Sequence, residues 1–162
     1  IRQTEASRGL GDVYKRQVVL DAMNAAIDMV KPGNHIMQPQ EISEKVITKG
    51  LVKLGLLDGD PEELHKSGAY KEFYMHKIGH WLGLDVHDAG DYVEGEEYMK
   101  FKPGMITTIE PGIYISSSMD VDDKWKGIGI RIEDDILVTK DGNENLTKKV
   151  PSDPEEIESL MS

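Results

Sequence analysis

The residues best able to do chemistry gather in one segment, HKIGHWLGLDVHDAG, at positions 76–90. His76 and His80 are four residues apart, a spacing at which a helix places two zinc ligands on one face, as in the motif His-Glu-x-x-His. Lys77 stands where that motif has its glutamate, and Gly79 makes a helix costlier by roughly 1 kcal/mol relative to alanine. We therefore predict a loop that leads into a strand, rather than a helical zinc motif.

The third histidine of this segment, His87, is predicted to end a strand over residues 82–87. Side chains alternate between the two faces of a strand, so His80 and His87 need not point the same way, yet both can flank one cavity. An alternative stays open, in which the three histidines are unrelated and one or two are buried and hydrogen-bonded. Histidine also serves as an ordinary core residue.

Two carboxylates lie inside apolar strand-like runs, where an ionised group is costly unless it is paired or bound to metal. In GMITTIEPG, strand alternation places Glu110 on the same face as Thr108. In GIGIRIEDD, it places Arg131 and Glu133 on the face opposite the isoleucines. Glu110 and Glu133 are therefore candidate metal ligands. The alternative is that Glu133 pairs with Arg131 and that Glu110 merely ends a strand before Pro111.

The predicted donor set contains imidazole nitrogen and carboxylate oxygen, and the sequence has no cysteine to add sulfur. Such donors favour Mn²⁺, Co²⁺, Fe²⁺ or Zn²⁺ in a two-ion site over a structural zinc. Hydrolysis is the reaction that such a site usually serves. The sequence therefore indicates a metal-dependent hydrolase.

Composition narrows the class of protein and its partners. A chain of 162 residues is about one domain, and no apolar run approaches the ~18 residues of a membrane span. The formal net charge of −11 argues against nucleic acid and against anionic membrane surfaces as partners. The lack of cysteine suits a reducing compartment such as the cytoplasm.

The elements that must position these residues run from helices to strands. Helical spacing of apolar residues predicts a helix from Val18 to the KPG stop at 31–33, and Pro39 opens a second that ends near Gly55. Asp60 and the proline after it predict a short third helix. From Phe73 onward, short β-branched runs predict strands, and a last helix starts at 153–154. The predicted fold class is α/β (α+β).

The first 17 residues do not fit this pattern. They show neither helical nor strand periodicity and no signal-peptide core, and SRGLGDVYKRQ resembles a translated sequencing adaptor. We predict that residues 1–17 are an unrelated, disordered leader, and that residues 18–162 form the domain.

Three motifs together carry a resemblance to a known family. YMHKIGHWLGLDVHDAG, EPGIYI and GIGIRIEDDILVTKDGNENLT resemble the C-terminal part of Xaa-Pro aminopeptidases, also called aminopeptidase P. These belong to the pita-bread metallopeptidase superfamily, with prolidase, creatinase and methionine aminopeptidase. The resemblance implies a curved, mostly antiparallel sheet whose concave face holds metal and whose outer face is covered by the two helices before Gly55.

The resemblance also implies roles for individual residues. His80, Glu110 and Glu133 would be ligands of two divalent metal ions, Mn²⁺ before Co²⁺, Zn²⁺ or Fe²⁺. Glu110 would also help to deprotonate the attacking water, and Glu133 would bridge both ions. His76 and His87 would not bind metal but would hold the substrate and move protons.

Two further residues match supporting positions of the family. Tyr114 and Arg131 would orient the carboxylates of the ligands. Arg131 suits this role because its guanidinium is a fixed bidentate donor.

The implied activity is removal of the N-terminal residue from peptides with proline in second position, by a hydroxide bridging the two ions. Two alternatives stay open: a prolidase that cuts only Xaa-Pro dipeptides, and a non-enzymatic pita-bread module that binds peptides. Family members commonly form dimers or tetramers, so a homo-oligomer in the cytoplasm is implied.

One departure from the family pattern concerns the ligand set. The family's five ligands begin with two aspartates upstream of the first matched helix, and Asp12 lacks the context to replace them. We therefore expect a C-terminal fragment of the catalytic domain, without the family's N-terminal domain. With three of five ligands, the chain by itself should be weak or inactive.

Overall fold

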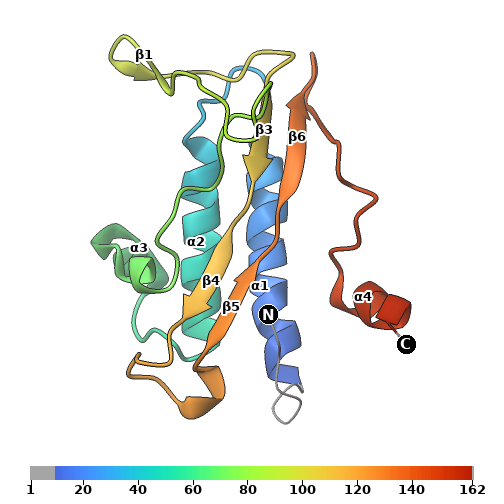
Figure 1. The fold of residues 1–162 in the computed structure, drawn as a ribbon. Coiled ribbons are helices and arrows are strands. Elements are labelled where there is room, and N and C mark those ends of the chain that lie inside the picture. The colour runs from blue at the N-terminus through green and yellow to red at the C-terminus, as the bar shows by residue number, and fades with distance from the viewer. Residues whose placement is uncertain (1–9, 162) are drawn as a thin grey trace.

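Two long helices form one layer of the molecule (Figure 1). The computed structural model describes residues 10–161, in which α1 spans Leu10–Ile27 and α2 spans Gln38–Lys53. The two helices pack against each other, and the Asn143 side chain donates hydrogen bonds to the carbonyls of Ile27 and Val30 at the end of α1. These bonds satisfy carbonyls that a helix end leaves without an intrahelical partner.

Helix α1 begins at Leu10 rather than near Val18, so the expected disorder does not hold for residues 10–17. Lys15 is buried, and its ammonium lies 4.6 Å from the centroid of the Trp125 ring. Packing against a distant aromatic ring thus extends the helix beyond its periodic apolar stretch. Residues 1–9 of the predicted leader lie outside the described residues, and the foreign origin of the leader stays a prediction.

The shorter helices begin where their local signals predict. Helix α3 spans Pro61–Ser67, and the Asp60 carboxylate accepts hydrogen bonds from two backbone amides of its first turn. Helix α4 spans Pro154–Met161, and Asp153 caps it in the same way. Both caps satisfy amides that would otherwise lack a partner.

The strands are antiparallel and short. Strand β3 (Ile106–Ile109) pairs with β6 (Asp134–Val138), which also pairs with β7 (Asn143–Asn145). Strand β4 (Gly112–Ile115) pairs with β5 (Ile128–Arg131). A small exposed hairpin is formed by β1 (Val93–Glu94) and β2 (Glu97–Tyr98), and 3₁₀ turns cover Ala69–Glu72 and Asp123–Trp125.

Each of the two long β runs is interrupted at its middle. Residues 110–111 separate β3 from β4, and residues 132–133 separate β5 from β6. Because Ile109 pairs with Asp134, and Gly112 pairs with Arg131, the two interruptions face each other. Pro111 has no amide hydrogen to donate across this gap. Glu110 and Glu133 therefore lie opposite each other, where the Ile132 amide donates one long hydrogen bond, of 3.4 Å, to the Pro111 carbonyl.

Residues 73–82 run alongside β3 and β4 as an additional extended segment. Backbone hydrogen bonds tie this segment to the sheet from Phe73 to Leu82, at 2.7–3.1 Å. Gly79 permits this close approach, because a Cβ there would lie 1.9 Å from the Thr108 carbonyl oxygen. We call residues 73–82 the histidine segment, since it carries His76 and His80.

The predicted strand over residues 82–87 is wrong. The chain leaves the sheet after Leu82 and continues in bends. The Asp88 carboxylate accepts the Leu84 amide hydrogen at 3.0 Å and folds the chain back locally. A side-chain-to-backbone bond thus replaces the ladder that alternation alone would suggest.

The hydrophobic core lies between the helices and one face of the sheet, as expected. Its most buried side chains come from α1, α2, the histidine segment and the strands, and include Val19, Leu51, Tyr74, Ile113 and Ile136. Figure 1 shows α1 and α2 together behind the strands. Across residues 10–161, every helix is too short or too polar to cross a membrane.

Candidate metal centre

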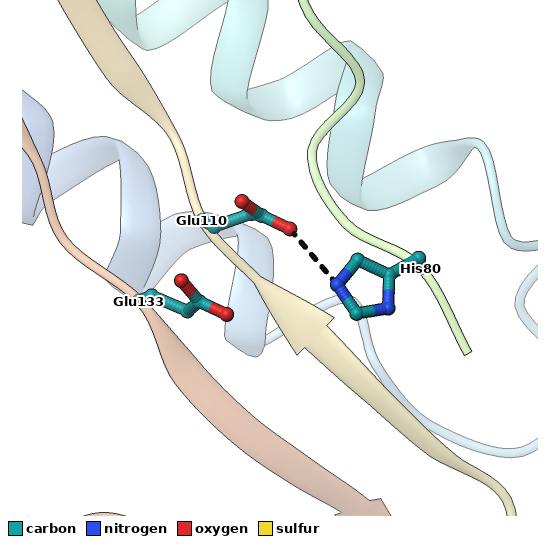
Figure 2. A group of neighbouring side chains, drawn as sticks. All are labelled: His80, Glu110 and Glu133. Carbon is teal, nitrogen blue, oxygen red and sulfur yellow. Dashed lines mark ion pairs between the residues drawn. The ribbon is translucent and has the colours of Figure 1, made fainter. Parts of the chain in front are cut away.

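Three of the predicted residues converge on one point of the sheet (Figure 2). His80 comes from the histidine segment, Glu110 follows β3, and Glu133 precedes β6. Each offers a ligand atom, and these atoms all lie within 4.8 Å of one another. The distance from His80 Nε2 to Glu110 Oε1 is 3.4 Å. Segments far apart in sequence therefore bring one imidazole and two carboxylates together.

The backbone around His80 sets which ring nitrogen is available. His80 Nδ1 lies 2.9 Å from the Trp81 carbonyl oxygen. Because a carbonyl only accepts hydrogen bonds, we assign the hydrogen to Nδ1, which leaves the lone pair of Nε2 directed toward Glu110. A backbone carbonyl that holds the second nitrogen is the usual arrangement for a histidine that binds metal.

Glu110 is buried but not isolated. Its Oε1 accepts a hydrogen bond from Thr108 Oγ1 at 3.1 Å, and its Oε2 lies 3.4 Å from Arg131 Nη1. A buried carboxylate needs such partners, because desolvation disfavours its charge. These contacts hold the carboxylate in place and leave it oxygen lone pairs for a cation.

Arg131 also reaches the other carboxylate. Its Nη2 lies 3.6 Å from Glu133 Oε2, and about half of the Arg131 side chain is exposed to solvent. The pairing of Glu133 with Arg131 that the sequence left open is thus present. It coexists with the convergence of Glu133 on His80 and Glu110, because the guanidinium approaches both carboxylates at once.

His76 and Tyr114 form a second polar pair close to this group. His76 Nδ1 donates to the Lys77 carbonyl at 2.8 Å, and the Tyr114 hydroxyl lies 2.8 Å from His76 Nε2. The hydroxyl therefore donates to Nε2. Burial raises the pKa of Tyr114 above its ordinary value, while the charge of Arg131 opposes that rise. The phenol thus keeps its hydrogen at neutral pH.

His87 lies beside His80 but at the surface. Their ring centroids are 4.3 Å apart, and His87 is exposed. The two rings therefore lie next to each other. Neither His87 nor His76 belongs to the group of potential metal ligands found among residues 10–161.

Sequence reasoning missed two supporting side chains. The Thr108 hydroxyl contacts both His80 and Glu110. Gln40 of α2 is buried, accepts a hydrogen bond from the Ile78 amide in the histidine segment, and donates to Glu44 at 2.9 Å. Strand alternation places Thr108 on the face of Glu110, but no local pattern indicates its contact with His80 or the contact of Gln40 with the histidine segment. Both of these contacts join segments that are distant in sequence.

The donor set fits a divalent ion. An imidazole with a free Nε2 and two carboxylates, one of them buried, match the preferences of Mn²⁺, Co²⁺, Fe²⁺ and Zn²⁺.

A family model described as metallopeptidase family M24 matches residues 12–140. The chain therefore belongs to metallopeptidase family M24, and its fold is the α/β pita-bread type, as predicted.

Individual relatives agree. A Xaa-Pro aminopeptidase of Haemophilus influenzae is 48% identical over 146 residues, which cover 90% of this chain and 34% of that protein. The Xaa-Pro aminopeptidase of Escherichia coli is 44% identical over 158 residues, covering 98% of this chain and 34% of its own length. The solved structure of Pseudomonas aeruginosa aminopeptidase PepP superposes with a TM-score of 0.92 at 51% identity, covering 94% of this chain and 35% of that chain. The chain spans about a third of the length of these relatives.

Proposed function

We propose that this chain supplies part of the catalytic site of a metal-dependent Xaa-Pro aminopeptidase. The reaction would release the N-terminal residue from a peptide with proline in second position. The observation that carries the proposal is the convergence of His80, Glu110 and Glu133 within 4.8 Å in a member of family M24. The names of the relatives, at 44–48% identity, support the choice of substrate.

The proposed ligands are His80, Glu110 and Glu133, holding two divalent ions, with Mn²⁺ as the first candidate. Ions bound there would polarise the scissile carbonyl and lower the pKa of water. Glu110 would accept the proton of the attacking water, because its carboxylate is buried and held by two partners. Arg131 would keep both carboxylates oriented through its paired guanidinium nitrogens.

The remaining polar residues would act on the substrate. The Tyr114 hydroxyl holds the His76 ring in one orientation, and His76 would hold the substrate by exchanging this hydrogen bond for one to the peptide. His87 is exposed beside His80 and can exchange protons with solvent, which suits a group that moves a proton to the departing amine.

Two other functions are less well supported. A prolidase would use the same ligands, but the relatives reported above carry the name of the aminopeptidase. A non-enzymatic binding module has no need of converging ligands, whereas His80, Glu110 and Glu133 still converge here. A dimer or tetramer of the intact protein and a cytoplasmic location are also proposed. Sedimentation of the full-length parent protein would test the first.

Metal binding is the decisive test. Mn²⁺ titrated calorimetrically into the purified chain should bind. Glu110→Gln should weaken Mn²⁺ affinity by about 100-fold or more, because loss of a residue that merely orients a ligand already weakens metal affinity by about 10–100-fold. Glu144→Gln is the matched control, because Glu144 is an exposed carboxylate on β7 away from the site. Equal affinity for the Glu110→Gln variant and the unmutated chain would refute the proposed site.

Peptide cleavage separates the candidate enzymes. With Mn²⁺, we expect slow release of glycine from Gly-Pro-Gly, because the family pattern includes two aspartate ligands that this chain does not match. A preference for the dipeptide Gly-Pro would instead identify a prolidase. Rapid cleavage of Gly-Pro-Gly would show that three ligands suffice.

A further inference from the structure

The side chain of Thr108 lies between two of the proposed metal ligands. It is 1% exposed, on β3, two residues before Glu110. Its Oγ1 is 3.0 Å from the His80 amide nitrogen and 3.1 Å from Glu110 Oε1. One buried hydroxyl therefore touches both the segment that carries the imidazole and the carboxylate itself.

The direction of both hydrogen bonds follows from the chemistry of the groups. A hydroxyl has one hydrogen and two lone pairs. The His80 amide can only donate, so Thr108 Oγ1 accepts that hydrogen. An ionised carboxylate can only accept, so the hydroxyl hydrogen goes to Glu110. The two hydrogen bonds thus run in one direction, from the His80 amide to the Thr108 hydroxyl and from that hydroxyl to the Glu110 carboxylate.

We propose that Thr108 is a positioning residue that sets the spacing of His80 and Glu110 before any ion binds. The same Oε1 that accepts from Thr108 lies 3.4 Å from His80 Nε2. A hydrogen bond to a charged acceptor in a buried place is stronger than one at the surface, so it can select one rotamer of the glutamate. This inference rests on the proposed function, in which His80 and Glu110 are ligands.

The adjacent Thr107 provides a matched control. It is also buried on β3, and the single hydrogen of its hydroxyl is shared between two backbone carbonyls, that of His80 at 3.1 Å and that of Thr108 at 3.2 Å. These hydrogen bonds reach backbone atoms but not the carboxylate. Removal of either hydroxyl therefore disturbs the same part of the fold, whereas removal of the Thr108 hydroxyl alone releases Glu110.

The first experiment needs no metal. Three variants are compared with the unmutated chain by NMR: Thr108→Val, Thr108→Ser and Thr107→Val. Thr108→Val should speed hydrogen exchange of the His80 amide. It should also let the Glu110 side chain populate several rotamers, which would appear as averaged three-bond couplings of the Glu110 β-protons. Thr108→Ser keeps the hydroxyl and should retain slow exchange and a single Glu110 rotamer, as should Thr107→Val. Thr108→Ala serves in place of Thr108→Val if valine prevents folding.

The second experiment measures Mn²⁺ affinity for the same variants by calorimetry. Thr108→Val should weaken binding by about 10–100-fold, as loss of a partner that orients a ligand does, while Thr108→Ser and Thr107→Val stay near the unmutated chain. Equal losses for Thr107→Val and Thr108→Val would overturn the inference, as would an unchanged Glu110 rotamer in Thr108→Val. If the unmutated chain binds no Mn²⁺, the proposed function fails, and the NMR measurement still decides whether Thr108 positions Glu110.

Discussion

The histidine segment and the loop that follows it differ in how the fold holds them. Residues 73–82 are hydrogen-bonded along β3 and β4, and their buried side chains enter the core. Residues 83–98 are largely exposed, including the apolar Leu84 and Val86. Both regions bring histidines to the candidate site. The proposed ligand His80 therefore lies on a segment that backbone hydrogen bonds tie to the sheet, where its geometry is set by folding. His76 shares that segment without being a ligand, whereas His87 lies on the surface loop.

The largest expected effect concerns one glycine from each region. In Gly79→Ala the new Cβ would lie 1.9 Å from a backbone atom, the Thr108 carbonyl oxygen, so the histidine segment must move. In Gly83→Ala it would lie 1.8 Å from the end of the Asp88 side chain, which can rotate away. We expect Gly79→Ala to lower the free energy of unfolding by about 1–3 kcal/mol, and Gly83→Ala by less than about 1 kcal/mol. Urea denaturation would measure both, and equal losses would contradict the distinction between the regions.

A medium effect is expected at alkaline pH. Burial raises the pKa of Tyr74, in the histidine segment, well above its ordinary value. Below about pH 10 the Tyr74 phenol is protonated in both the folded and the unfolded chain. Above about pH 10 the unfolded chain releases the phenol proton more readily than the folded chain does, so the free energy of unfolding falls as pH rises. Tyr74→Phe should therefore lose less unfolding free energy than the unmutated chain between pH 7 and about pH 10.5.

The control for Tyr74 lies in the loop. Tyr98 is half exposed, and Tyr98→Phe is the matched substitution of a phenol outside the core. Urea unfolding at the two pH values measures both variants. A Tyr74→Phe variant with the same alkaline loss as the unmutated chain would show that another group dominates.

The smallest effect is expected for the loop histidine. His87→Ala removes an exposed side chain, so the free energy of unfolding should change by less than about 0.5 kcal/mol. Mn²⁺ affinity should also be unchanged, because His87 lies outside the group of converging ligand atoms. A clear loss of Mn²⁺ affinity in calorimetry would make His87 a ligand and remove the distinction between the two regions.

Local signals in the sequence predicted those elements that depend on neighbouring residues. Pro39 and Asp60 mark the starts of α2 and α3, and alternation correctly separated Glu133 from the buried Ile132. Such features are decided within a few residues by backbone geometry and side-chain caps.

The errors and omissions have the opposite character. The strand predicted over residues 82–87 is replaced by a loop that Asp88 closes, and α1 is extended by packing of Lys15 on Trp125. The roles of Thr108 and Gln40 depend on contacts with the histidine segment, far away in sequence. Periodicity carries no information on such contacts, so only the folded chain reveals them.

Pro111 has a consequence for how the candidate metal centre is arranged before any ion binds. Glu110 and Glu133 lie between the two paired stretches, and Pro111 has no amide hydrogen with which to continue the ladder on its side of that gap. The regular ladder is therefore incomplete beside the two proposed ligands whether or not an ion is bound. The covalent structure of Pro111, with its ring and its missing amide hydrogen, makes this feature of the main chain permanent.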